Sequence, residues 1–158
     1  MRTCSIVLTA FITIATTACQ GSAETALEDV FCDALAGPSL ASVDATEAQA
    51  GAPETAVGEG HIEVALTAGE DGNYTGVVAY TADEAGFFAF GFDENVPVTV
   101  VDGSGATLAW EVEVPGAACD ALAIRRTVEL GLDTVYLEFG PTDLASVSFI
   151  AEESDDDL

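Results

Sequence analysis

"TLAWEVEV", residues 107–114, is the stretch that shows the fold class of this chain most directly. Apolar residues stand at every second position: Leu108, Trp110, Val112 and Val114. Glu111 and Glu113 occupy the positions between the last three. Successive side chains of a strand point to opposite faces, so this alternation predicts a strand with one face buried and the other in water.

Seven further segments show the same period of two. They are "HIEVAL" (61–66), "GVVAYTA" (76–82), "FFAFGFD" (87–93), "VPVTVVD" (96–102), "AIRRTVEL" (123–130), "TVYLEFG" (134–140) and "LASVSFIAEE" (144–153). Turn-forming residues separate several of them, as at 83–86 and 102–105. No helical pattern lies between these segments. The sequence therefore predicts an all-β domain over residues 61–153, an antiparallel β-sandwich of about eight strands.

A different pattern precedes this region. "TALEDVFCDALAGP", residues 25–38, carries the apolar stripe of a short amphipathic helix: Leu27, Val30, Phe31, Ala34 and Leu35. Thr25 and Glu28 form a capping box, and Gly37 followed by Pro38 is a stop signal. Small and acidic residues dominate 39–60 and predict a mobile connector with one weak strand at most. At the other end, residues 154–158 are expected to form a solvated acidic tail.

The first eighteen residues read as a signal peptide. Arg2 supplies a positive start, and the uncharged run from Cys4 to Ala18 is too short to span a bilayer. Thr16, Thr17 and Ala18 before Cys19 resemble the bacterial lipobox, which implies that Cys19 is diacylated and becomes the first residue of the mature chain. Ordinary cleavage, after Ala18 or after Ala23, is the alternative. Either way we expect export, with a lipid anchor at the outer membrane or periplasmic face, or secretion.

Export determines how the remaining cysteines are interpreted. Cys4 leaves with the leader and lipid occupies Cys19, so Cys32 and Cys119 remain as one pair in an oxidising compartment. We expect a disulfide between them. The alternative is a metal site with two thiolates, for which His61 is the one possible imidazole partner.

The charge balance excludes some partners. The chain has 28 acidic residues against three arginines, a formal net charge of -25. Such a chain repels polyanions, so nucleic acid and anionic lipid headgroups are poor partners. Excess carboxylate is compatible with divalent-cation binding, although a solvated surface explains it as well. Calcium could bind the loops at 93–95 or 102–104, but turn chemistry accounts for both, and we assign no metal ligand and no cofactor.

Residues suited to catalysis are scarce. His61 is the one histidine, and no nucleophile elbow lies near it, so we assign no catalytic residue. Arg125 and Arg126 are neighbours on a predicted strand and must point to opposite faces, which rules out a joint phosphate clamp. At least one of the two is expected to pair with a carboxylate.

Three elements carry a resemblance: "CDALAGP" (32–38), "ENVPVTVVDGSG" (94–105) and "LEFGPT" (137–142). Together they resemble a group of uncharacterised secreted lipoproteins of Gram-negative bacteria. The region around the second element is also similar to β-sandwich domains appended to secreted bacterial peptidases. The lipoprotein group often carries histidines near the first cysteine and in its tail, which implies metal capture, but this chain has Ala34 and an all-acidic tail at those places.

These observations lead to one functional expectation and two alternatives. We expect a non-enzymatic, envelope-anchored lipoprotein whose β-sandwich serves binding or scaffolding, with the membrane as partner through the N-terminal lipid. A divalent-cation-binding surface protein is the first alternative, and a secreted hydrolase of unrecognised type is the second. A further protein partner fits the first expectation.

Overall fold

The computed structural model describes residues 20–55 and 60–154. Within these ranges the chain forms one helix and twelve strands. In chain order they are α1 (Gln20–Ala36), β1 (Ala41–Asp44), β2 (Glu54–Thr55), β3 (Ile62–Ala65), β4 (Thr67–Ala68), β5 (Tyr74–Tyr80), β6 (Gly86–Phe92), β7 (Val98–Asp102), β8 (Thr107–Leu108), β9 (Val112–Pro115), β10 (Ile124–Leu130), β11 (Val135–Thr142) and β12 (Ser146–Ser154). The fold is therefore mostly β, with one helix, as the strand periodicity predicts.

The strands form two sheets. Sheet A has the order β1-β3-β12-β6-β10-β9, and sheet B has the order β2-β5-β11-β7-β8, with β4 also pairing with β5. Most neighbouring strands are antiparallel, but β1 is parallel to β3 and β2 is parallel to β5. The prediction of about eight strands, all antiparallel, is thus wrong in its count and in these two pairings.

One hydrophobic cluster draws its residues from both sheets. Aromatic rings span the space between them. Phe92 of β6 meets Phe139 of β11 edge-on with ring centroids 6.4 Å apart, and Tyr80 of β5 meets Phe90 of β6 at 5.2 Å. The inward positions of the alternating segments build this cluster, because one face of each strand is apolar.

The segment "TLAWEVEV" is not one strand. Its first residues form β8 in sheet B and its last form β9 in sheet A, so the chain crosses between the sheets around Trp110. The Trp110 Nε1–H donates to the carbonyl oxygen of Val98 at 3.0 Å. Burial still alternates along the segment, with Glu111 and Glu113 exposed. The alternation was predicted correctly, whereas the continuity of the strand was not, because burial on every second residue persists through the crossing.

The predicted connector takes part in both sheets. It contributes β1 to sheet A and β2 to sheet B, where at most one weak strand was predicted. Its small residues permit close packing. The Ala45 side chain lies against Gly76, and a Cβ on residue 76 would clash with it. Thr55 is buried and its hydroxyl donates to the carbonyl oxygen of Ala79 at 2.8 Å. The connector therefore joins the edges of the two sheets.

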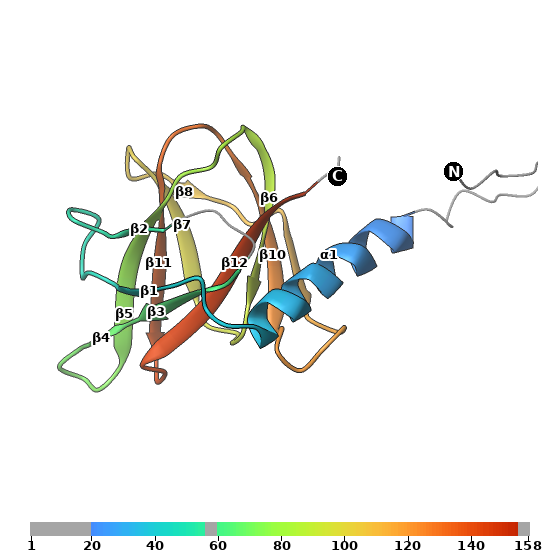
Figure 1. Ribbon diagram of the computed structural model, residues 1–158. Coiled ribbons are helices and arrows are strands. Elements are labelled where there is room, and N and C mark those ends of the chain that lie inside the picture. The colour runs from blue at the N-terminus through green and yellow to red at the C-terminus, as the bar shows by residue number, and fades with distance from the viewer. Residues whose placement is uncertain (1–19, 56–59, 155–158) are drawn as a thin grey trace, which may run out of the picture.

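Helix α1 begins earlier than predicted and ends where predicted. It starts at Gln20, so Thr25 lies inside the helix rather than at its cap, because Ala23 and Glu24 also favour helix. It ends at Ala36, before Gly37 and Pro38. Figure 1 shows α1 on the outside of the strands, beside β12, with its amino-terminal turns extending beyond them.

The last strand, β12, extends one residue further than the predicted strand, which ended at Glu153. Glu153 and Ser154 belong to β12 and pair with Phe88 and Phe87 of β6. Ser154 is buried, so it is not part of an acidic tail. The remaining tail residues, 155–158, lie outside the described residues.

Candidate functional site at the carboxyl end of helix α1

A disulfide ties α1 to the strand-built body. Cys32 of the helix and Cys119, in the loop before β10, are bonded with an S–S distance of 2.06 Å and a Cα–Cα distance of 5.9 Å. The predicted pairing is confirmed. The loop that it closes is long, with 87 positions separating the two cysteines in sequence. Both thiols are used in this bond, so the two-thiolate metal site is not formed.

An apolar contact provides the second attachment. Phe31 is fully buried in a small cluster with Ala89, Leu122 and Ile150, on the face of sheet A that α1 covers. The ring lies on Gly91 of β6, where a Cβ would come within 2.8 Å of it. The prediction of an apolar stripe along the helix is correct only in part. Val30 is 47% exposed, because it lies on the flank of the helix rather than over the sheet.

His61 provides the third attachment. It precedes β3 and is buried, and its Nδ1 lies 2.9 Å from the carbonyl oxygen of Ala34 in the last turn of α1. A carbonyl oxygen accepts only, so Nδ1 carries the proton and donates. The last carbonyls of a helix lack partners within the helix, and His61 supplies one of them. His61, the one histidine in the sequence, therefore has a structural role.

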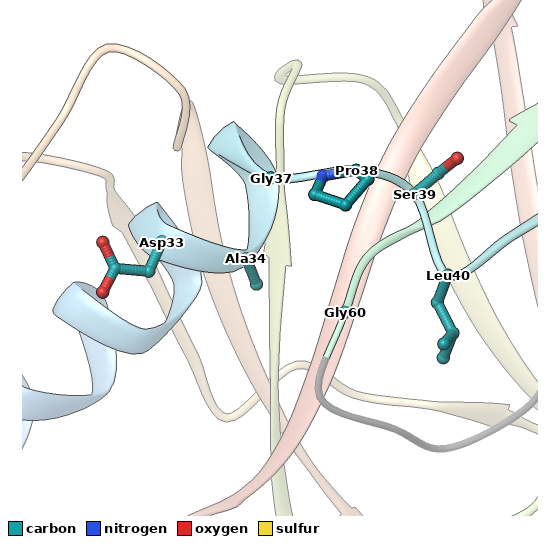
Figure 2. Close-up of a pocket in the computed structure, with 7 residues that line it drawn as sticks. All are labelled: Asp33, Ala34, Gly37, Pro38, Ser39, Leu40 and Gly60. Atoms are coloured by element: carbon teal, nitrogen blue, oxygen red, sulfur yellow. The ribbon is translucent and has the colours of Figure 1, made fainter.

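An open pocket of about 350 Å³ lies where the helix ends, and we call it the Leu40 pocket. Its lining residues come from the last turn of α1, the segment leading to β1, and the residue before His61: Asp33, Ala34, Gly37, Pro38, Ser39, Leu40 and Gly60. In Figure 2 the side chains of Ala34 and Leu40 point to the same side of the chain, with Gly60 between them. The Asp33 carboxylate and the Ser39 hydroxyl point away from that side.

The backbone fixes this pocket in position. The Leu40 N–H donates to the carbonyl oxygen of His61 at 2.8 Å, and the Gly37 N–H donates to that of Ala34 at 3.1 Å. A Cβ on residue 60 would lie 3.2 Å from the Leu40 Cβ, so Gly60 keeps the chain close beneath the leucine. Sequence reasoning did not find this pocket, because residues far apart in sequence build it together.

The two arginines are both buried on β10 and face opposite sides. Arg126 forms an ion pair with Glu113 at 2.8 Å, which confirms the predicted pairing with a carboxylate. Its guanidinium also lies over the rings of Phe92 and Trp110, at 5.4 and 5.8 Å from their centroids. Arg125 pairs with Gly91 in register and so shares the face that α1 covers. The pair therefore forms no joint anion clamp.

The acidic loops considered for calcium have structural uses. Asp102 Oδ1 accepts hydrogen bonds from the backbone N–H groups of Ser104 and Ala106 and from the Ser104 hydroxyl, which lowers the pKa of its carboxyl group. In the other loop, Asp93 Oδ1 accepts from the Ser148 N–H at 2.8 Å. Asp102 also lines an open pocket of about 490 Å³ with Asp133 and polar neighbours. The described residues contain no group of three or more His, Cys, Asp or Glu side chains placed to hold a metal ion.

The predicted signal peptide, residues 1–18, and the lipidation site Cys19 lie outside the described residues. Helix α1 is neither long nor apolar enough to cross a bilayer, and it is the one helix in the part of the chain that the structure describes. Comparisons with protein-family models and with curated proteins found no match.

Proposed function

We propose that the chain is an exported, lipid-anchored protein of the cell envelope whose two sheets form a non-catalytic β-sandwich for binding or scaffolding. The observation that carries the proposal is the triple attachment of α1. The helix begins at Gln20, next to the proposed lipid site at Cys19, and Phe31, Cys32 and Ala34 attach it to the body. An anchor at Cys19 would thus be joined to the sandwich through a firmly held helix.

The disulfide supports the proposed compartment. Disulfides persist in oxidising environments such as the bacterial periplasm and the cell surface, and they are rare in the cytosol. Cys32 and Cys119 are close enough to be bonded without distortion of the fold, and their bond holds the element nearest the anchor. The resemblance to secreted lipoproteins agrees with this location.

Charge and helix length set the position of the body relative to a membrane. A helix of 17 residues is about 25 Å long at roughly 1.5 Å per residue. A chain with a formal charge of -25 is repelled by anionic headgroups. Only the amino-terminal turns of α1 extend beyond the strands, so they would act as a short spacer that holds an acidic body near the membrane without lying on it.

The non-catalytic part of the proposal rests on how the candidate residues are used. His61 donates to a backbone carbonyl, Arg126 is engaged by Glu113, and Asp102 accepts hydrogen bonds within its own turn. Each of these side chains has a structural partner. The Leu40 pocket offers an apolar wall and so suits binding better than chemistry.

The lipid anchor is tested by fractionating cells that express Cys19→Ala. We expect the wild-type chain in the membrane fraction and the variant in the soluble periplasmic or external fraction. Cys4→Ala, which changes a cysteine within the leader, is the matched control and should stay with the membranes. If Cys19→Ala remains in the membrane fraction like the wild type, the anchor proposal is wrong.

A further inference from the structure

Large apolar side chains are rarely exposed in the part of the chain that the structure describes. Within residues 20–55 and 60–154 the structure exposes Val30, Leu40 and Leu132, at 47, 52 and 64%. Two of the three belong to one region. Leu40 lines the Leu40 pocket, and Val30 lies one helical turn before Ala34, which also lines it. Val30 and Ala34 therefore lie on the same side of α1, and Ala34 and Leu40 supply the apolar side chains of the pocket.

Hydrogen bonds hold the backbone around the Leu40 pocket in position before any partner arrives. Leu40 is fixed by its N–H bond to the His61 carbonyl oxygen, and Ala34 accepts the His61 side chain. Just beyond the pocket, β1 is the edge strand of sheet A. A preorganised apolar pocket loses little conformational entropy on binding, and this favours its use as a docking site for an apolar side chain.

The negative charge around the pocket indicates which charged residues a partner should carry. Asp33 lines the pocket, its carboxylate pointing outward, and Asp29 lies exposed one turn before it on the helix. The whole chain has a formal charge of -25. Complementary potentials steer association and like charges suppress it, so a cationic partner is favoured and an anionic lipid surface is not.

We propose that the Leu40 pocket binds a segment of a partner protein in which one apolar side chain is flanked by lysine or arginine. The apolar residue enters between Ala34 and Leu40, and the flanking cations face Asp33 and the acidic surface around it. This inference rests on the proposed binding role but does not require the lipid anchor.

The test uses three synthetic peptides as probes and NMR of the full chain with its Cys32–Cys119 disulfide intact. The first peptide has one leucine flanked on each side by lysines, the second has alanine in place of the leucine, and the third has glutamates in place of the lysines. The backbone amides of Gly37, Leu40 and Gly60 report on the pocket. Affinity is measured at low salt and again at physiological salt.

Two protein variants separate the pocket from general charge attraction. Leu40→Asp and Leu132→Asp each add one negative charge at an exposed leucine, so non-specific attraction of a cationic peptide changes equally in both. We expect Leu40→Asp to weaken binding of the leucine peptide about tenfold or more. The free energy gained by burying one leucine side chain corresponds to a change in Kd of about this size. Leu132→Asp should bind the leucine peptide at least as tightly as the wild type does, because its added charge attracts the lysines and the pocket is unchanged. Leu40→Ala, which adds no charge, should weaken binding in the same direction.

The peptides give matching expectations. The leucine peptide should bind saturably and more weakly at higher salt, because screening reduces the charge attraction. The alanine peptide should bind about tenfold more weakly, and the glutamate peptide should not shift the pocket amides. The proposal is overturned if the leucine peptide leaves these amides unshifted, if both aspartate variants bind equally, or if vesicles of anionic lipid shift the amides and the peptide does not.

Failure of this inference and failure of the anchor proposal are distinguishable. A chain that lacks lipid but binds the leucine peptide at the pocket would contradict the anchor alone. A lipidated chain that binds none of the peptides would contradict the pocket alone.

Discussion

The ring of Phe31 rests directly on the backbone of Gly91. A Cβ at residue 91 would lie 2.8 Å from Phe31 Cδ2 and 3.0 Å from Leu122 Cδ1, and real Cβ contacts are essentially never as close as the first of these. The absence of a side chain at Gly91, near the carboxyl end of β6, is therefore what lets α1 dock on sheet A. This contact joins the helix nearest the proposed anchor to a central strand of the body.

Gly91→Ala is expected to weaken helix docking. Insertion of a methyl group into a tightly packed contact costs about 1–3 kcal/mol, which should appear as a lower urea midpoint. Gly131→Ala is the matched control, because a Cβ there meets nothing within 4 Å, and its effect should stay within about 0.5 kcal/mol. Equal stability of the two variants would mean that Phe31 does not depend on this glycine.

Removal of the disulfide is expected to lower the stability of the fold more than Gly91→Ala does. Cys32→Ser together with Cys119→Ser should lower the free energy of unfolding by about 2–5 kcal/mol, because the unfolded chain regains the freedom of a long loop. Hydrogen exchange in α1 should rise at the same time, since the helix loses one of its attachments. Wild-type protein treated with reductant should match the double variant. A double variant as stable as the untreated wild type would contradict this role of the bond.

Tyr80→Phe is expected to leave stability unchanged or to raise it. Tyr80 is 1% exposed, and its hydroxyl has no hydrogen-bond partner within the described residues. A buried polar group without a partner costs about 1–3 kcal/mol, so its removal can recover part of that amount. Tyr80→Leu is the comparison that removes the ring contacts with Phe88 and Phe90 and should destabilise. A clear loss of stability in Tyr80→Phe would show that the hydroxyl has a partner after all.

Because the Tyr80 hydroxyl is buried, we expect the stability of the protein to depend on pH in the alkaline range. Burial raises the pKa of Tyr80 above its ordinary value of 10.0, and the negative charges of Asp83 and Glu152 add to the effect. Above pH 10 the unfolded chain releases this proton while the folded chain keeps it, so stability falls by up to about 1.4 kcal/mol per pH unit. Urea unfolding between pH 9 and about pH 11 should show a shallower fall for Tyr80→Phe than for the wild type. Parallel curves would contradict the assignment.

His61→Ala is expected to loosen the end of α1. Loss of the hydrogen bond to the Ala34 carbonyl oxygen and of a buried ring should cost about 1–3 kcal/mol. His61→Asn, whose amide can donate from a similar position, should restore part of the loss. Hydrogen exchange of the last turn of α1 measures the effect locally. Protection equal to wild type in His61→Ala would show that the contact contributes nothing.

Much of the fold could be predicted from sequence, because a strand with one buried face shows an alternation of apolar and polar residues over a few positions. The alternation at 107–114 identified which residues are partly buried, yet it could not show that the chain changes sheet around Trp110. The parallel pairing of β1 could not be predicted, for a related reason. Its small residues have little periodicity of their own, and its place depends on pairing with β3, which no local pattern contains.

The candidate site was predictable only in part. The cysteine count and the inferred compartment were sufficient to pair Cys32 with Cys119. The Leu40 pocket was not predictable, because Leu40 becomes a pocket wall only where the segment after α1 meets Gly60. His61 drew attention as a titratable side chain, and only the fold shows that its ring faces the end of a helix.

The central claim is that this is an exported, lipidated chain with an oxidised body, and intact mass spectrometry of the protein extracted from membranes without reductant tests it most directly. We expect a chain that begins at Cys19, carries the mass of its acyl groups and lacks the two hydrogens that the Cys32–Cys119 bond removes. A full-length chain that begins at Met1 in the soluble cell interior with reduced thiols would contradict it, and a mature chain that begins at Glu24 would contradict the lipid anchor.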